Sequence, residues 1–352
     1  MIDIQFYMKV FELKQRLMKG DSLDKKFVFD EFKKYRSKEP VIYNIETTNA
    51  CNMKCKMCPR TTLMSRPVEM MDMGTFKKIV GQIRPFSEKE WCEWEKFVKK
   101  NYGISDNKMD ENHFFLYVIP KVLVLHGYGD PLLDGHMPER IKLLTKNDIP
   151  SYFSCNPINI NINTIEAMLK NGLNYLKFSI DTTYDDHNKK IRGVSANFSE
   201  SYRKITHLLE IKEKYNYKTT FITTMLNFNK SWQEEEFKKI QMAFSGLDIY
   251  IYLKSLDQQW YQKKRQGTKS IHWTEFCQFP WSSMTIKSNG EVVMCAEDYN
   301  NEIVLGDAKK ESLYNIWNGG RYYKFRKQHF NLISGMKCTD RCDMALVGSL
   351  IR

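Results

Sequence analysis

The sequence predicts an α/β fold in which a partial (β/α)6 barrel, similar to a TIM barrel, is followed by a small C-terminal domain. Three observations predict it: six β-like runs alternate with helical patterns between residues 40 and 255, the alternation then stops, and four cysteines follow. Alternation at this spacing is typical of parallel βαβ units, whose right-handed crossovers curve a six-stranded sheet toward a barrel. The predicted parts are an N-terminal helical extension (1–39), the barrel (40–255) and the C-terminal domain (256–352).

The first predicted element is an amphipathic helix in which Phe6, Val10, Leu13 and Leu17 recur at helical spacing. We expect it to dock on the body of the protein, with attachment to a membrane surface as the alternative. The segment lacks the charged and apolar regions of a signal peptide. No run in the chain approaches the roughly 18 apolar residues of a membrane span. These features predict a cytoplasmic protein.

The barrel is predicted to contain six strands with helices between them. The candidate strands are 40–47, 121–127, 150–156, 174–181, 218–225 and 248–254. The candidate helices are 73–84, 137–147, 163–171, 198–215 and 232–243. Residues 86–120 are too many for a simple loop and predict an inserted helix with a polar loop.

Two elements are predicted beyond the barrel. Residues 281–295 are typical of a β-hairpin that turns at Asn289-Gly290, a strong turn dipeptide. Residues 311–330 predict a helix broken near Gly319-Gly320.

Cys51, Cys55 and Cys58 follow the first predicted strand, where parallel barrels carry their functional loops. No fourth cysteine or histidine lies nearby, since the next histidine is His113. Zinc with a distant fourth ligand and a disulfide with a spare thiol are two interpretations. Thiolates that bind three irons of a 4Fe–4S cluster and leave the fourth iron open fit the trio best.

The C-terminal region supplies a second set: Cys277, Cys295, Cys338 and Cys342. Four thiolates can fully ligate a 4Fe–4S cluster or a structural zinc ion. The chain has nine cysteines and no export signal, so metal binding or redox chemistry is favoured over disulfides.

The CxxxCxxC spacing after the first strand of a βα barrel resembles the radical SAM superfamily. The resemblance implies that the open iron binds the amino and carboxylate groups of S-adenosylmethionine. It implies that one electron cleaves this cofactor to a 5′-deoxyadenosyl radical, which removes a substrate hydrogen atom. It also implies a reductant such as flavodoxin or ferredoxin.

Further stretches resemble the family's cofactor-binding motifs. "GYGDP" (127–131) stands where the family has Gly-Gly-Glu-Pro, with Asp130 instead of Glu; "SCN" (154–156) and "SID" (179–181) end the third and fourth strands. Arg192 resembles the arginine that binds the cofactor carboxylate, and a surface ion pair is the alternative interpretation. For Gly127 and Gly129 the alternative is an ordinary turn. The implied cofactor-binding residues are Gly127, Tyr128, Gly129, Asp130, Ser154, Asn156, Ser179, Asp181 and Arg192.

The C-terminal domain resembles a twitch domain, a shortened form of the SPASM extension that carries one auxiliary 4Fe–4S cluster. "GEVVMCAEDYN" and "SLYNIWNGGRYYKFR" are similar to stretches of 2-deoxy-scyllo-inosamine dehydrogenases. Peptide-modifying relatives hold two auxiliary clusters and additional cysteines. The expected cofactors are therefore S-adenosylmethionine and two 4Fe–4S clusters, one of them auxiliary.

We expect oxidation of an alcohol carbon on a polar small molecule such as a sugar or aminocyclitol, and the net charge of +12 favours an anionic one. Epimerisation, dehydration and peptide modification are the alternatives within the family, and a non-catalytic zinc scaffold is the alternative outside it. Cys155 is a candidate hydrogen-atom donor or a buried apolar residue, and Glu297 and Asp298 are candidate proton acceptors or surface carboxylates. No motif for nucleic-acid binding occurs, and no such partner is expected.

Overall fold

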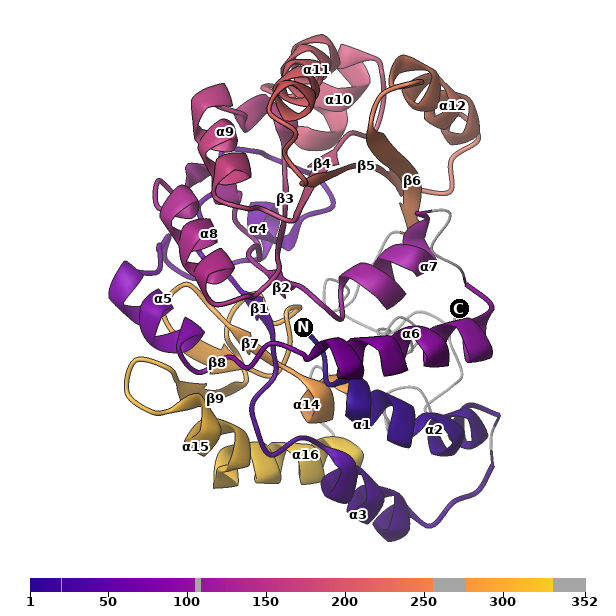
Figure 1. Ribbon diagram of the computed structural model, residues 1–352, viewed down its shortest axis with the longest axis vertical. Helices are drawn as coiled ribbons and strands as arrows, with labels where there is room; N and C mark the ends of the chain where they lie inside the picture. The colour runs from indigo at the N-terminus through magenta and orange to yellow at the C-terminus, as the bar shows by residue number, and fades with distance from the viewer. Residues whose placement is uncertain (20, 105–108, 256–276, 332–352) are drawn as a thin grey trace.

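The computed structural model describes residues 1–19, 21–104, 109–255 and 277–331, which are organised around one nine-stranded sheet (Figure 1). The sheet has the order β6-β5-β4-β3-β2-β1-β7-β8-β9, and its first six strands are parallel. These six are β1 (Ile42–Ile45), β2 (Leu123–Val124), β3 (Ser151–Cys155), β4 (Tyr175–Ser179), β5 (Thr220–Asn227) and β6 (Ile249–Ser255). Each lies within or overlaps a predicted run, with β5 and β6 extending one or two residues beyond theirs, so the partial barrel is confirmed.

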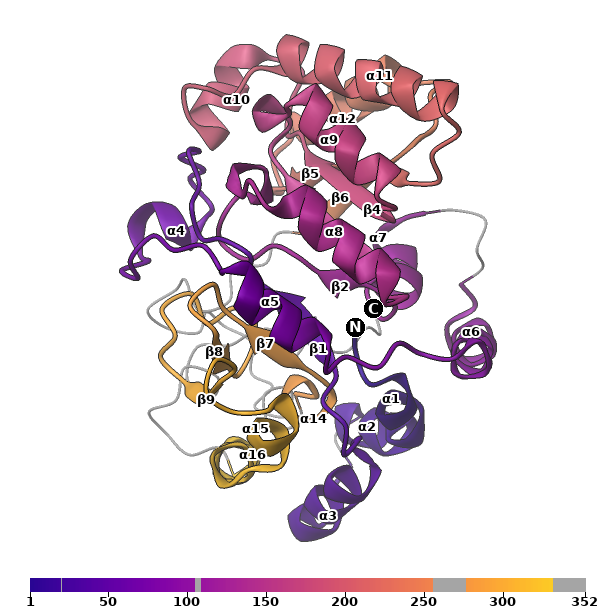
Figure 2. The same ribbon diagram turned by 60° about the vertical axis from the view of Figure 1, so that its left-hand side comes forward.

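Helices cover the outer face of the barrel (Figure 2). They are α5 (Met73–Val80), α8 (Met137–Lys146), α9 (Ile162–Lys170), α11 (Phe198–Lys214) and α12 (Gln233–Ala243), as predicted. Alternate strand residues such as Leu176 and Phe178 face them and form the main core. Two further helices, α4 (Pro59–Thr62) and α10 (Asp185–Arg192), were not predicted.

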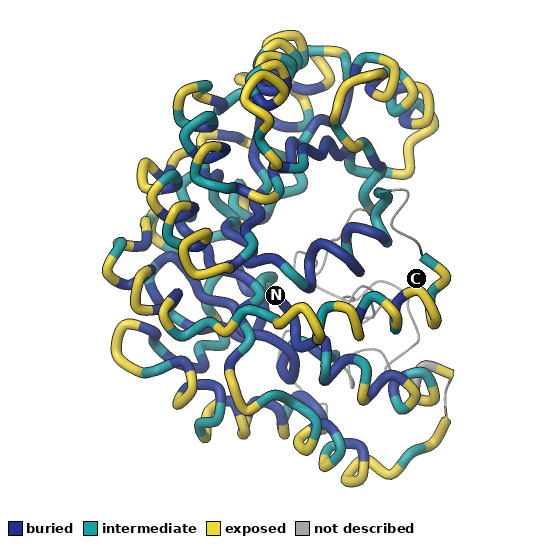
Figure 3. The backbone as a smooth tube through the Cα atoms, viewed as in Figure 1, coloured by how far each residue is buried: buried dark blue, intermediate teal, exposed yellow. Residues whose placement is uncertain are grey.

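The inserted segment begins with the predicted helix, α6 (Glu88–Tyr102). Ser87 and Glu90 form a capping box at its start, and its C-cap is Gly103 in the left-handed conformation. The following residues differ from the polar loop expected, since they form α7 (Glu111–His113) and the π-helical turn η1 (Phe114–Val118). This second part is buried, as Figure 3 shows, because its apolar side chains turn into the barrel.

The interior of the barrel is closed by this π-helical turn. Phe114 lies 5.2 Å from the Tyr152 ring of β3 and 5.8 Å from the Tyr252 ring of β6. Val118 and Ile222 belong to the same buried cluster. An open, six-stranded barrel leaves its lumen exposed, and the insertion fills it with aromatic side chains.

The C-terminal domain extends the sheet of the barrel. Its described residues form α14 (Phe279–Ser282), β7 (Met284–Ile286), β8 (Glu291–Val293), β9 (Val304–Asp307), α15 (Leu313–Asn318) and α16 (Gly320–Phe330). The predicted hairpin is confirmed by β7 and β8, which are antiparallel, and Gly290 adopts a φ of 89° in the turn. Because β7 pairs in parallel with β1, the sheet continues from one domain into the other.

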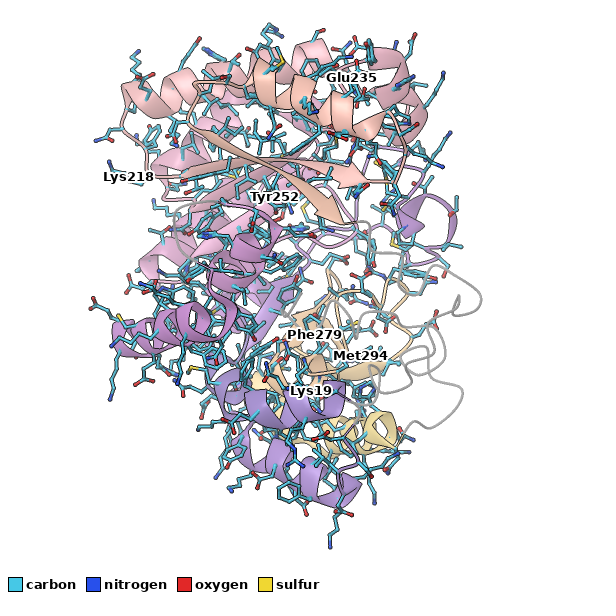
Figure 4. The ribbon with its side chains drawn as sticks, turned by 90° about the vertical axis from the view of Figure 1, so that its right-hand side faces the viewer. Lys19, Lys218, Glu235, Tyr252, Phe279 and Met294 are labelled. Carbon is cyan, nitrogen blue, oxygen red and sulfur yellow. The ribbon has the colours of Figure 1, made fainter. Side chains whose placement is uncertain are left out.

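The N-terminal extension docks on the C-terminal domain. It forms α1 (Ile4–Lys9), α2 (Phe11–Met18) and α3 (Lys25–Tyr35) rather than one long helix. Phe6 and Phe32 form a buried cluster with Trp281 of α14 and Phe330 of α16. Figure 4 shows Lys19, which directly follows α2, below Phe279 and Met294. No helix in the described part of the chain is long and apolar enough to cross a membrane.

Candidate active site

A cavity of about 320 Å³ lies where the parallel strands end. Parallel βα sheets carry their ligand sites at this edge because the connecting loops converge there. Most of the residues predicted as site residues line it. They are Cys51, Cys55, Cys58, Gly127, Tyr128, Gly129, Asp130, Ser154, Cys155, Asn156, Ser179, Arg192 and Glu297.

The loop that carries the first three cysteines is fixed by backbone hydrogen bonds on two sides. Lys54 and Lys56 donate their backbone N–H groups to the carbonyls of Arg192 (3.0 Å) and Ile191 (2.9 Å) at the end of α10. The backbone N–H of Asp130, in the loop after β2, donates to the carbonyl of Ala50 at 2.8 Å. The cysteine loop is therefore held between α10 and the loop after β2.

The chemistry of the three thiols fits a cluster. Burial raises the pKa of Cys51 and raises that of Cys58 to about 12, so iron must displace protons when it binds. Among the residues with described positions, no three His, Cys, Asp or Glu side chains are placed to hold a single metal ion. The ligands of one zinc ion converge on a point, whereas thiolates of a cluster bind separate irons and lie farther apart.

Asp130 joins the ends of β2 and β3 beside the cysteine loop. Its carboxylate accepts hydrogen bonds from Asn159 Nδ2 at 2.7 Å, from the backbone N–H of Asn156 at 3.2 Å and from that of Leu132 at 3.0 Å. Burial raises its pKa, although these donors oppose the rise. The carboxylate lines the cavity and can receive the amino group of a ligand there.

Arg192 brings a fixed positive charge to the cavity. Its Nε donates to Asp181 Oδ2 at 2.6 Å, and its Nη1 lies 4.0 Å from Cys55 Sγ. Burial opposes the charge, but the carboxylate of Asp181 and then Cys55 raise the pKa of Arg192. This ion pair is buried. The alternative interpretation of the sequence, in which Arg192 forms an ion pair on the surface, is therefore wrong. Asp181 itself does not line the cavity, so its direct contact is with Arg192 and the backbone N–H of Leu226.

Two family models match the chain. The model described as the radical SAM superfamily matches residues 110–240, and that of the SPASM iron–sulfur cluster-binding domain matches residues 277–343. The chain therefore contains a radical SAM domain followed by a SPASM domain. Its cofactors are accordingly S-adenosylmethionine, a 4Fe–4S cluster and auxiliary iron–sulfur in the SPASM domain.

Solved structures share the fold of this radical SAM enzyme. BtrN, in complex with AdoMet and 2-DOIA, is 12% identical, with a TM-score of 0.50 over 86% of this chain and 94% of that chain. SuiB of Streptococcus suis, bound to S-adenosylmethionine, is 13% identical, with a TM-score of 0.52 over 91% and 78% of the two chains. The structure of anSMEcpe with bound AdoMet and Kp18Cys peptide is 14% identical, with a TM-score of 0.50 over 86% and 89%. No curated protein matches the chain in sequence.

The SPASM domain contains the second set of cysteines. Cys277 precedes α14, and Cys295 is buried just after β8. Neither lines the cavity, as expected of ligands to a separate auxiliary centre. Cys338 and Cys342 fall within the residues matched by the SPASM model but outside the described residues.

Glu297 and Asp298 of this radical SAM enzyme have opposite surroundings although they are adjacent. Glu297 lines the cavity, and its Oε2 accepts a hydrogen bond from the Tyr128 hydroxyl at 3.0 Å. The fully buried Asp298 accepts from the backbone N–H groups of Glu302 (2.9 Å) and Ile303 (2.8 Å). Asp298 therefore stabilises a loop, and a contact with substrate is not supported.

Sequence reasoning missed a buried ion pair at the rim. Arg66 Nη2 donates to Glu46 Oε1 at 2.8 Å, and Ser288 Oγ donates to the same oxygen at 3.2 Å. Burial opposes ionisation of Glu46, but Lys287 and Arg66 outweigh it and lower its pKa. Glu46 thus ties the end of β1 to the SPASM domain. A glutamate near the end of the first predicted strand (40–47) was the available signal.

Sequence reasoning also missed four cavity residues on the inner strand faces. They are Lys177, Thr224, Leu226 and Lys254. His126, which follows β2 and also lines the cavity, is interpreted from sequence as a residue beside the active face or as a core histidine. Within "YLKFS", the alternation of a half-buried Tyr, a Lys and a Ser with apolar residues was the signal for an inward polar face.

Proposed function

We propose that this radical SAM enzyme oxidises an alcohol carbon of a polar small molecule, such as a sugar or an aminocyclitol. The observation that carries the proposal is that the Glu297 carboxylate lines the same cavity as the three cysteines and stands two residues from Cys295. An alcohol carbon becomes a carbonyl by losing a hydrogen atom, a proton and an electron. A cavity that joins a radical source, a carboxylate and a nearby electron acceptor can receive all three.

When bound, the cofactors supply the radical that takes the hydrogen atom and the auxiliary centre that takes the electron. Cys51, Cys55 and Cys58 would hold the first cluster. Arg192 would bind the carboxylate of S-adenosylmethionine and Asp130 its amino group, and Asp181 holds Arg192 in place.

The remaining cavity residues orient the reactants and move the proton. Asn156, Ser154 and Ser179 offer polar groups for the cofactor beside the cluster. Glu297 takes the proton of the substrate hydroxyl, and Tyr128 fixes the orientation of that carboxylate through their 3.0 Å hydrogen bond.

The SPASM domain is proposed to hold one auxiliary 4Fe–4S cluster. Its four cysteines, Cys277, Cys295, Cys338 and Cys342, suffice for one fully ligated cluster and leave none for a second. A fully ligated cluster has no position for substrate, which suits electron transfer. A flavodoxin or ferredoxin in the cytoplasm is the proposed reductant.

Epimerisation is the second candidate, and Cys155 favours it. This thiol is 4% exposed and lines the cavity. Burial raises its pKa well above the ordinary value, which keeps the S–H bond that a hydrogen-atom donor needs. Peptide modification is the third candidate, since the solved structure of anSMEcpe holds a peptide.

Product analysis with anaerobically reconstituted enzyme in deuterated water tests the proposal. Sugars, aminocyclitols and their phosphates are first screened for formation of 5′-deoxyadenosine. The accepted substrate should yield a ketone, and Glu297→Gln should lower ketone yield by about 10²-fold or more while 5′-deoxyadenosine still forms. The control Glu311→Gln, at an exposed position of the same domain, should behave as wild type.

Two outcomes would count against the proposal. A product of unchanged oxidation state that carries deuterium at carbon, lost in Cys155→Ala, would establish epimerisation instead. Undiminished ketone from Glu297→Gln would remove that residue from proton transfer.

A further inference from the structure

Two lysines reach the cavity from the half of the barrel sheet that is remote from β1. Lys177 is on β4 and Lys254 on β6, and both line the cavity. Lys177 is only 6% exposed, and its ammonium lies 4.8 Å from the centre of the Phe114 ring and 5.4 Å from that of Tyr152. The rings of Phe114 and Tyr152 therefore stabilise a positive charge at the base of the cavity.

The strand register brings neutral donors to the same wall. Lys177 pairs with Ser154 of β3, and Ser179, two residues later on the same face of β4, pairs with Thr224 of β5. Leu226, the next inward residue of β5, pairs with Lys254. The hydroxyl-bearing side chains here line the cavity together with the two ammonium groups.

His126 shows that both ammonium groups act on one part of the cavity. Burial, then Lys177 and Lys254, lower the pKa of His126 to about 3, so both lysines are within electrostatic reach of this imidazole. The imidazole is neutral at working pH. Its Nδ1 accepts the backbone N–H of Ser154 at 3.2 Å, which leaves the hydrogen on Nε2.

The other charged groups of the cavity lie among the residues already assigned to the cofactor and to proton transfer. Arg192 pairs with Asp181, Asp130 accepts from Asn159, and Glu297 accepts from Tyr128. The β4–β6 wall, which is the part of the cavity lined by strand residues of β4, β5 and β6 and by His126, adds two positive charges, hydroxyl donors and a neutral imidazole. Carboxylates and phosphates bind where ammonium groups and such donors converge.

We propose that the substrate carries a carboxylate or phosphate group and that Lys177 and Lys254 bind it on the β4–β6 wall. The inference rests on the proposed function and adds to it the class of substrate, an anion. Binding of this anionic group, which is remote from the reacting carbon, would position that carbon for reaction with the radical derived from the cofactor.

Titration calorimetry of the reconstituted full chain, loaded with S-adenosylmethionine, tests the inference with two probes, inorganic phosphate and acetate. Wild type should bind at least one of them, and the tighter one identifies the anionic group. Lys177→Met and Lys254→Met should each weaken binding by about tenfold or more, and the double variant should abolish it. Lys177→Arg should keep most of the affinity because it keeps the charge.

The matched control is Lys170→Met, at an exposed position on α9, which should bind the probes as wild type does. Methionine is close to lysine in length and apolar, so the variants should keep the wild-type thermal midpoint. Equal binding by wild type and the double variant, or no binding of either anion by wild type, would overturn the inference. Failure of the proposed function would appear separately, as absence of a ketone product from a wild type that still binds the anion.

Discussion

Gly129 determines whether the loop after β2 can support the cysteine loop. A Cβ atom at this position would lie 2.2 Å from the carbonyl oxygen of Thr48 and 2.8 Å from that of Ala50. Both atoms belong to the backbone, so neither can move aside as a flexible side chain would. The adjacent hydrogen bond from Asp130 to Ala50 depends on the same close approach.

Gly129→Ala should therefore displace the cysteine loop. We expect loss of S-adenosylmethionine binding and a decrease of about 1–3 kcal/mol in the free energy of unfolding. Denaturant unfolding and a binding titration measure the two effects. Gly135→Ala is the control because its added Cβ meets no atom within 4 Å. Normal cofactor binding by Gly129→Ala would show that the close approach is not required.

At the scale of elements, the strands and the outer helices were predictable because their apolar residues follow a period of 2 or 3.6. The helix α10 was not, because "DDHNKKIR" has no apolar stripe and is held by the cysteine loop instead. The turn η1 was expected to be part of a loop, since its apolar run "FFLYV" gives no sign that it enters the barrel. Tertiary contacts determine both elements.

The N-terminal helices offer a prediction at this scale. Phe6 is fully buried, and its ring lies 5.3 Å from that of Phe32. Phe6→Ala should lower the free energy of unfolding by about 3–5 kcal/mol, because it leaves a cavity between the extension and the SPASM domain. Phe27→Ala, whose side chain is 52% exposed, should change it by less than about 0.5 kcal/mol. Equal effects of the two variants would contradict the docking of the extension.

At the scale of the whole molecule, one sheet joins the radical SAM barrel to the SPASM domain. The pairing of β1 with β7 and the contacts of Glu46 with Arg66 and Ser288 place the region of Cys295 near the cysteine loop. Electron transfer between two centres requires such proximity. The sequence predicted two adjacent domains but could not reveal this pairing. The strands β1 and β7 are far apart in the chain, and neither sequence indicates which strand it pairs with.

The residues of the active-site cavity were also predictable in part. Cysteine spacing and strand-end motifs are local in sequence, so most cavity residues could be named in advance. Lys177 and Lys254 could not, because a lysine in a strand indicates a cavity only when the inward face is known. Asp298 was wrongly grouped with Glu297. Its carboxylate turns away from the cavity to accept the backbone N–H groups of Glu302 and Ile303, and the sequence does not show this loop conformation.

Electron paramagnetic resonance of the reduced, reconstituted enzyme, with and without S-adenosylmethionine, tests the central claim most directly. The account predicts that the cofactor changes the cluster signal, that Cys55→Ala abolishes the change, and that Cys92→Ala, at an exposed cysteine of α6, preserves it. A wild-type signal that does not respond to the cofactor would contradict the account.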